Sequence, residues 1–318
     1  MLHDYGLGVS TGPKLALGAM NFGKRTDEAE SKRIIFRALE LGVTHIDTAN
    51  AYTDGNSERI VGEAVRGRSG VTVATKCGFG RMTGGKPEGL SPARLRAALD
   101  ESLSRLKLDY VDLYYLHVPD HTTPIEDTLD TMAELLASKK VRSWGISNYG
   151  AWQVLEMMML RPNMPKPVIA QHLYNVLIRE LDVEWFSFAK KYGIETTIYN
   201  PLAGGLLTGK HARDGSTQKG SRFDKNKLYL GRYFTPAMFD RVDQLTAVAK
   251  ENGLSLLELA YAWAAGAPGV DSIILGPASV EQLEQGIEAC KIQLAPDTRA
   301  RIDALHRDWS GTDAHYVR

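Results

Sequence analysis

Short apolar runs alternate with longer segments of helical periodicity along most of this chain. In residues 29–41, for example, Ile34, Ile35, Ala38 and Leu41 fall on one face of a helix. The apolar runs predict eight strands, at 15–18, 44–47, 71–76, 111–117, 143–147, 168–171, 195–199 and 272–275. The periodic segments predict helices at 29–41, 58–66, 91–106, 125–138, 151–160, 183–192, 237–252, 256–265, 280–289 and 296–309.

This alternation indicates the fold class. Most neighbouring strands are separated by one helix, and such connections favour right-handed parallel crossovers. We therefore predict an α/β protein that forms one (β/α)8 TIM barrel domain over residues 1–318, with a doubly wound open sheet as the alternative. An irregular stretch at 203–234 and two extra helices interrupt the rhythm between strands seven and eight. Long excursions of this kind are usually functional.

Composition narrows the partners and the compartment. Among the 318 residues, Lys and Arg together number 38, as do Asp and Glu, so the formal net charge is zero. This balance argues against a nucleic acid or a membrane surface as partner. Two cysteines, Cys77 and Cys290, make no disulfide framework, which favours a reducing compartment. With no recognisable signal peptide or bilayer-spanning run, we expect a cytoplasmic monomer or homodimer.

Polar side chains of four complementary types follow three successive predicted strands. Asp47, Lys76 and His117 lie at strand ends, and Tyr52 lies in the turn after Asp47. The ends of parallel barrel strands face one side, so these groups can converge. An ammonium lowers the pKa of a nearby phenol, a carboxylate holds the ammonium charged, and an imidazole can orient a carbonyl. Each residue alone has an ordinary structural explanation, but the set suits protonation of an oxygen while a hydride arrives at carbon.

The motifs around these residues resemble those of the aldo-keto reductases. The similarity runs through most of the chain, in residues 15–18, 45–49, 74–76, 109–117 and 145–148. Segments 117–121, 199–210, 281–285 and 316–318 resemble the aflatoxin-aldehyde reductase branch most closely. The resemblance implies Tyr52 as the general acid, Lys76 and Asp47 as its tuning pair, and His117 as the group that orients the carbonyl.

The resemblance also implies NADPH, with NADH as the alternative, bound without a Rossmann domain. No GxGxxG follows the first strand. The nicotinamide amide is expected against Ser147, Asn148 and Gln171, with Tyr199 stacked on its ring. Backbone amides of the glycine-rich segment 201–210 could cradle a pyrophosphate. The remaining cofactor candidates are Leu202, Gly204, Leu206, Gly209, Lys210, Arg222, Gly276, Ser279 and Gln282.

The adenine end departs from the family pattern. Gly286 stands where an Asn commonly contacts adenine, Pro277 is unusual in its turn, and residues 278–284 contain no Arg or Lys. The family pattern for NADPH is therefore incomplete at the adenine end, and NADH stays the alternative. We predict no metal site.

Large apolar residues and arginines near barrel ends are the candidates for binding a small carbonyl substrate. The predicted pocket walls are Met20, Phe22, Phe79, His121, Trp144 and Tyr233. Arg232 and Arg318 could bind a substrate carboxylate. We expect reduction of aldehydes, including dicarbonyls or semialdehydes, to alcohols. The alternatives are a cofactor-sensing regulatory subunit like the channel β-subunits and an NAD(P)-dependent sugar or polyol dehydrogenase.

Overall fold

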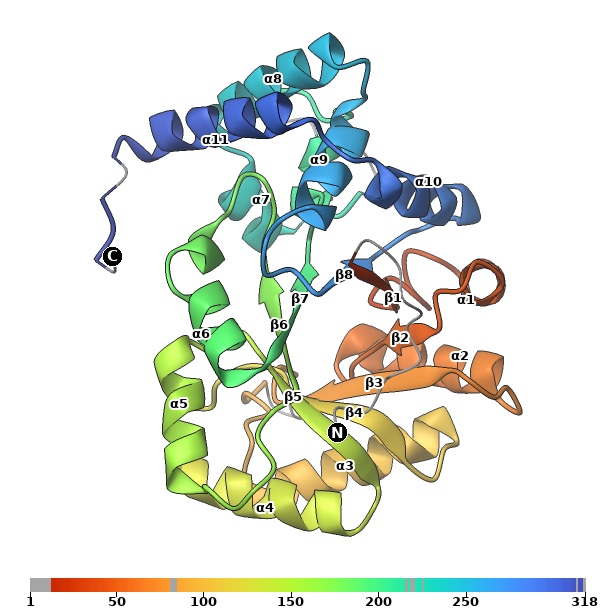
Figure 1. The fold of residues 1–318 in the computed structure, drawn as a ribbon. Helices are drawn as coiled ribbons and strands as arrows, with labels where there is room; N and C mark the ends of the chain where they lie inside the picture. The colour runs from red at the N-terminus through yellow and green to blue at the C-terminus, as the bar shows by residue number, and fades with distance from the viewer. Residues whose placement is uncertain are drawn as a thin grey trace.

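Eight parallel strands close into a barrel in the computed structural model, which describes residues 13–80, 85–214, 217, 221–224, 226–312 and 314–316 (Figure 1). The strands are β1 (Lys14–Gly18), β2 (His45–Asp47), β3 (Thr72–Cys77), β4 (Val111–Leu116), β5 (Val141–Ser147), β6 (Ile169–Leu173), β7 (Glu195–Tyr199) and β8 (Ser272–Leu275). Each strand pairs with the next, and β8 pairs with β1, where Ser272 lies opposite Lys14. This closure confirms the predicted (β/α)8 barrel and rules out the open sheet.

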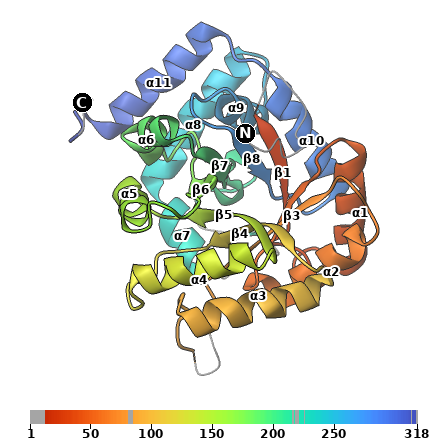
Figure 2. The same cartoon turned by 60° about the horizontal axis from the view of Figure 1, so that its bottom comes forward.

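Helices surround the barrel on the outside, as the turned view in Figure 2 shows. They are α1 (Glu28–Glu40), α2 (Asn56–Val65), α3 (Pro92–Leu106), α4 (Ile125–Ala137), α5 (Ala151–Leu160), α6 (Trp185–Tyr192), α7 (Lys227–Tyr233), α8 (Pro236–Glu251), α9 (Leu256–Ala265), α10 (Val280–Lys291) and α11 (Pro296–Ser310). Within the described residues there are also three short 3-10 helices: η1 (Tyr52–Gly55), η2 (Glu180–Asp182) and η3 (Ala203–Thr208). No helix in the described residues is both long and apolar enough to span a membrane.

Local chemistry explains where α1 begins and how it packs. The carboxylate of Asp27 accepts a hydrogen bond from the backbone N–H of Glu30 and so caps the helix. Ile34, Ile35 and Ala38 are fully buried on the face turned toward the barrel. Removing such apolar surface from water is what holds each helix on the strands.

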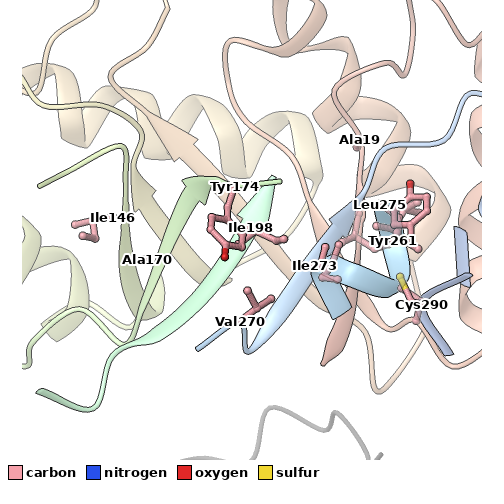
Figure 3. Packing of buried hydrophobic residues seen from close by; sticks show 14 of the residues in the cluster. Ala19, Ile146, Ala170, Tyr174, Ile198, Tyr261, Val270, Ile273, Leu275 and Cys290 are labelled. Carbon is pink, nitrogen blue, oxygen red and sulfur yellow. The ribbon is translucent and has the colours of Figure 1, made fainter. Parts of the chain in front are cut away.

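Packing of the late helices fixes the end of β8. Figure 3 shows Tyr261 of α9 and Cys290 of α10 beside Leu275, the last residue of that strand. All three are buried. Because Leu275 is held in this way, the turn that follows it, beginning at Gly276, has a defined position at the barrel mouth.

The long excursion between β7 and β8 is more regular than predicted. The stretch 203–234, expected to be irregular, contains η3 and the seven-residue helix α7. The side chain of Asn226 caps α7 by accepting from the N–H of Tyr229. A helix this short, with Gly231 inside it, has too few turns for periodicity to reveal. The extra helices α8 and α9 confirm the predicted insertion before the last strand.

Candidate active site

A cavity of about 820 Å³ opens at the carboxyl ends of the strands. This is the end of a (β/α)8 barrel where active sites are built, and the volume suits a ligand of cofactor size. Asp47, Tyr52 and His117 line it, together with Ser147, Asn148, Gln171 and Tyr199. The structure therefore brings the predicted catalytic and nicotinamide-binding side chains to one place.

A buried ion pair lies beneath this cavity. The Nζ of Lys76 on β3 donates to Oδ1 of Asp47 on β2 at 2.5 Å and to the carbonyl oxygen of Thr48 at 2.8 Å. Lys76 is fully buried. Burial lowers the pKa of the Lys76 ammonium, while the Asp47 carboxylate opposes that effect. The positive charge of Lys76 is thus compensated locally by the negative charge of Asp47.

Tyr52 begins η1 and lies over this pair. The Nζ of Lys76 is 5.0 Å from the centroid of the Tyr52 ring. Burial holds the pKa of the Tyr52 phenol well above its usual value, and Asp47 raises it further. The expected lowering of this pKa by Lys76 does not prevail, because burial dominates, and the positive group that opposes the rise is Arg222. The phenol consequently keeps its proton at neutral pH, as a general acid must before it donates.

His117 completes the cluster as a neutral imidazole. Its ring centroid lies 5.8 Å from that of Tyr52 in an edge-to-face arrangement and 5.0 Å from that of Phe79. Burial, together with Lys76, holds the His117 pKa well below its usual value. A neutral imidazole carries one N–H donor, which suits it to orient a carbonyl oxygen rather than to supply a proton.

A second buried carboxylate holds the Lys76 strand in place. Glu58 of α2 accepts from Oγ1 of Thr75 at 2.5 Å and from Nε of Arg105 at 2.6 Å. The Glu58 side chain is fully buried. Thr75 precedes Lys76, so the network ties the catalytic strand to the helices outside it. The signal for Glu58 in the sequence is an acidic residue on a helix face that is otherwise buried.

The amide-binding candidates form one connected group. Oγ of Ser147 donates to the carbonyl oxygen of Gln171 at 2.9 Å, and the Tyr199 hydroxyl donates to Oδ1 of Asn148 at 2.7 Å. Nδ2 of Asn148 donates to the carbonyl oxygen of His117 at 3.0 Å. The polar side chains at the ends of β5, β6 and β7 are therefore mutually oriented before any ligand arrives.

The cavity wall is strongly cationic although the chain has no net charge. Arg25, Lys210, Arg222 and Arg232 line it, and the one carboxylate among its described lining residues is Asp47, which is paired with Lys76. Such a wall favours an anionic ligand.

Two polar atoms on this wall support the same conclusion. Within the part of the chain that the structure describes, buried Nδ1 of His211 and Oγ of Ser221 have no hydrogen-bond partner. Both residues line the cavity. Together with the cations, these groups fit the phosphates of a dinucleotide cofactor.

Other predicted residues divide between the cavity and its surroundings. Those that line it are Met20, Phe79, Leu202, Gly204, Lys210, Arg222, Arg232, Gly276 and Gln282. Leu206 is buried in the core, Ser279 caps α10, and Gly209 ends η3, and none of the three lines the cavity.

Several predicted pocket walls are core residues instead. Phe22 and Tyr233 are fully buried in the hydrophobic core, and Trp144 is 2 % exposed with its Nε1 donating to the carbonyl oxygen of Pro165. His121 is exposed on the loop after β4 and does not reach the cavity. Large apolar residues near strand ends can face either the cavity or the helices, and the sequence does not separate these cases. Arg318 lies outside the described residues.

Sequence reasoning missed several cavity residues, among them Asn21, Arg25, Asn200 and Tyr229. Nη1 of Arg222 donates to Oδ1 of Asn200, and Nδ2 of Asn200 donates to the Tyr229 hydroxyl. Asn21 and Arg25 lie in the loop after β1. The sequence indicated only the apolar Met20 and Phe22 in this loop, and no local pattern marks the polar Asn21 and Arg25 beside them.

Comparisons with known proteins agree with this geometry. The model of the Aldo/keto reductase family matches residues 14–307. The chain is 36% identical to aflatoxin B1 aldehyde reductase member 2 of Homo sapiens, covering 93% of this chain and 87% of that protein. It is 34% identical to a probable voltage-gated potassium channel subunit beta of Oryza sativa subsp. japonica, covering 94% of each.

A solved structure is also similar. The holo form of aldo-keto reductase AKR11C1 from Bacillus halodurans superposes with a TM-score of 0.73 at 28% identity. The match covers 92% of this chain and 91% of that one. These findings confirm the family resemblance expected from the sequence motifs.

Proposed function

The chain belongs to the aldo/keto reductase family, and from this premise we propose that it reduces aldehydes to alcohols with NADPH. Family membership makes it an NAD(P)H-dependent oxidoreductase. The observation that carries the proposal is the arrangement of Tyr52 above the Lys76–Asp47 pair and beside His117, at the edge of a cationic cavity.

Tyr52 is the proposed general acid. A nicotinamide cofactor, when bound, supplies the hydride that reaches the carbonyl carbon. The O–H bond of Tyr52 breaks as its proton passes to the carbonyl oxygen, and the resulting phenolate lies near the Lys76 ammonium. Solvent then returns a proton to Tyr52. Neutral His117 donates a hydrogen bond to the same carbonyl oxygen and sets its direction.

The residues proposed to hold the cofactor follow the chemistry of its parts. Ser147, Asn148 and Gln171 offer donors and acceptors to the carboxamide, and Tyr199 offers a ring to stack. Lys210 and Arg222 offer charge to the phosphates. The positions of all six on one cavity support this assignment.

The proposed substrate class is an aldehyde with an anionic or polar tail, such as a semialdehyde or a dicarbonyl. Met20, Phe79 and Leu228 give the cavity rim an apolar surface and are 37%, 56% and 60% exposed. Arg232 lies near Tyr229, with 5.9 Å between its guanidinium carbon and the ring centroid. It could receive a carboxylate in a bidentate geometry. The human relative is named as an aldehyde reductase, which agrees with this class.

Replacement of Tyr52 by Phe tests the proposal. We expect kcat for NADPH-dependent reduction of a good aldehyde to fall by at least on the order of 10²-fold, because general acid catalysis is lost. Cofactor affinity should remain close to that of the wild type. Tyr110→Phe, which removes a hydroxyl from a residue outside the cavity, should leave the rate unchanged. A Tyr52→Phe enzyme that reduces the aldehyde at the wild-type rate would exclude Tyr52 as the acid.

A regulatory subunit is the second candidate, because the rice relative is named as a channel subunit. Such a protein would use the same cavity to sense the redox state of its cofactor. Steady-state turnover and single-turnover oxidation of bound NADPH separate the two functions. An enzyme turns over repeatedly at a rate comparable to its first turnover, whereas a sensor completes one turnover and then stalls.

A further inference from the structure

We propose that Thr53 is a positioning residue for the proposed general acid: it anchors a strained, left-handed turn and thereby holds the Tyr52 ring beside the Lys76 ammonium. This inference rests on the proposed function, because it concerns the proton donor of that reaction. The side chain of Thr53 does not line the cavity. It therefore acts through Tyr52, which precedes it in the chain.

The backbone changes from a right-handed to a left-handed conformation around Tyr52. Ala51 is right-handed, with φ −78° and ψ −10°. Thr53 (φ 50°, ψ 42°), Asp54 (φ 55°, ψ 39°) and Gly55 (φ 84°, ψ −4°) are left-handed. Glycine adopts this region readily, but a β-branched threonine rarely does, because its Cβ crowds the backbone. Such a conformation persists only where surrounding contacts hold it, and it is often found at active sites.

The hydroxyl of Thr53 makes the contacts that hold this turn. Its Oγ1 donates to the carbonyl oxygen of Phe22, in the loop between β1 and α1, at 2.8 Å. The same atom accepts from the backbone N–H of Ser57, in the first turn of α2, at 3.0 Å. Phe22 is fully buried, and Oγ of Ser57 donates to the carbonyl oxygen of Ala19 at 2.8 Å. One hydroxyl group thus joins the turn after Tyr52 to two segments that are themselves held in place.

The other end of the turn packs closely against α3. A Cβ at Gly55 would stand 2.6 Å from Cδ of Arg105, whose Nε donates to the buried carboxylate of Glu58. The turn is therefore fixed at Gly55 by packing and at Thr53 by hydrogen bonds. Of these two restraints, the one at Thr53 is adjacent to the proposed acid.

The place of the Tyr52 ring matters because proton transfer requires close approach of the reacting atoms. The ring centroid lies 5.0 Å from Nζ of Lys76 and 5.8 Å from the centroid of the His117 ring. Without the Thr53 hydroxyl, the turn can relax toward a less strained conformation, and the chain at Tyr52 would move with it. A displacement of about 1 Å at a reacting group can lower a rate by up to about 10²-fold.

Thr53→Val tests the inference, because it removes the hydroxyl and keeps the branched shape. We expect kcat for NADPH-dependent aldehyde reduction to fall by on the order of tenfold, because the acid is displaced. The KM for the aldehyde and the affinity for NADPH should stay within about twofold of the wild type, because no ligand contact is lost. Thr53→Ser keeps Oγ and should recover most of the rate.

Thr246→Val is the matched control. It also removes a half-buried threonine hydroxyl that donates to a backbone carbonyl, that of Val242 at 2.7 Å, but it lies on α8 and does not line the cavity. This variant should leave kcat unchanged. Unchanged kcat in Thr53→Val as well would overturn the inference.

Thr53→Gly separates positioning from stability. Glycine adopts the left-handed conformation without strain, so this variant should melt at a temperature no lower than that of Thr53→Val. Its kcat should nevertheless be as low as that of Thr53→Val, because the hydroxyl is missing. A merely structural role for Thr53 predicts wild-type kcat in a stable Thr53→Gly enzyme, and that result would also overturn the inference.

Combining Thr53→Val with Tyr52→Phe tests whether Thr53 acts through Tyr52. Once the phenol hydroxyl is gone, Thr53→Val should lower the residual kcat by less than about twofold, because the two residues act as a unit. An equal fall in both backgrounds would mean that Thr53 acts by another route.

Hydrogen exchange of the backbone segment 49–57 tests the anchor without relying on turnover. Exchange should be faster in Thr53→Val than in Thr53→Ser, because the turn opens more often when Oγ1 is absent. Equal exchange in the two variants would show that the hydroxyl does not hold the turn. A wild-type protein that reduces no aldehyde would instead refute the proposed function, whatever the exchange shows.

Discussion

Gln171 and Asp47 are joined across the barrel mouth by a hydrogen bond of 2.9 Å from Nε2 of Gln171 to Oδ2 of Asp47. The other carboxylate oxygen of Asp47 accepts from Lys76. The Asp47 carboxylate therefore connects Lys76 on β3, which lies beside the proposed proton donor, with Gln171 on β6, which is proposed to bind the nicotinamide. Changes at Gln171 should reach both the cofactor and the acid.

Replacing Gln171 by Glu should introduce a pH dependence that the wild type lacks. Two carboxylates about 3 Å apart share one proton, so one of their pKa values rises strongly. Below that pKa the protonated Glu can donate to Asp47, as the amide does. Above it, repulsion should displace Asp47 from Lys76. We expect kcat/KM to fall by on the order of tenfold as pH rises from about 5 to 9.

The control is Gln171→Leu, which cannot gain a charge. Its kcat/KM should be lower than that of the wild type at every pH, because the buried Asp47 carboxylate loses a hydrogen-bond donor. The plot of its kcat/KM against pH should not show the additional decline toward high pH that is expected for Gln171→Glu. A wild-type pH profile in Gln171→Glu would mean that Asp47 and residue 171 are not coupled in solution.

His172 should make the fold sensitive to acid. The ring is buried on β6, 4.2 Å between centroids from Trp185, and burial lowers the His172 pKa to about 3. Because an unfolded His titrates near 6.5, the unfolded chain binds more protons below that pH. Stability is thus fully present above pH 6.5 and declines toward pH 3. Between pH 7.5 and 5 the loss from this residue is on the order of 2 kcal/mol.

Chemical denaturation at several pH values measures this effect. His172→Leu should flatten the decline in unfolding free energy, whereas the same change at exposed His121 should not. An identical acid slope in the wild type and His172→Leu would contradict the assignment.

Gly62 should be intolerant of any side chain. A Cβ there would stand 2.1 Å from the carbonyl oxygen of Leu106, which is backbone and cannot move aside easily. We expect Gly62→Ala to destabilise the protein by at least about 1–3 kcal/mol through overpacking between α2 and α3.

Gly231 offers the matched comparison, because nothing lies within 4 Å of the Cβ it lacks. Gly231→Ala inside α7 should be neutral or stabilising by up to about 1 kcal/mol, from helix propensity alone. Thermal unfolding measures both effects. Equal melting temperatures of Gly62→Ala and Gly231→Ala would contradict the prediction, because they would show that α2 and α3 can move apart with little loss of stability.

The barrel could be predicted from the sequence because its determinants are local. Each strand is a short apolar run, and each helix, like α1 with Ile34, Ile35 and Ala38, shows its buried face as a period. The four catalytic candidates could be located because strand ends in a parallel barrel share one side. The position of a residue at the end of a strand then fixes the side of the barrel on which it lies.

Other parts of the site depend on distant contacts that no local pattern encodes. Trp144 and Phe22 have the same character as Phe79, yet only Phe79 faces the cavity. The pKa of Tyr52 rises rather than falls, because burial and Asp47 outweigh the opposing charge of Arg222. Arg25 and Arg222 line one cavity only because the barrel closes. Each of these outcomes is decided by tertiary packing.

The excursion between β7 and β8 carries Arg222, Tyr229 and Arg232, whereas the proposed acid in η1 and its supports in β2, in β3 and directly after β4 come from the first half of the chain. The arginine proposed to bind a substrate carboxylate and the proposed proton donor therefore lie on separate stretches of the sequence. On the proposed roles, a recombination or short insertion within residues 221–233 would change the carboxylate-binding side of the cavity and leave Tyr52, Lys76 and Asp47 unaltered. Such a change would give a reductase with a different substrate specificity and the same proposed proton-transfer residues.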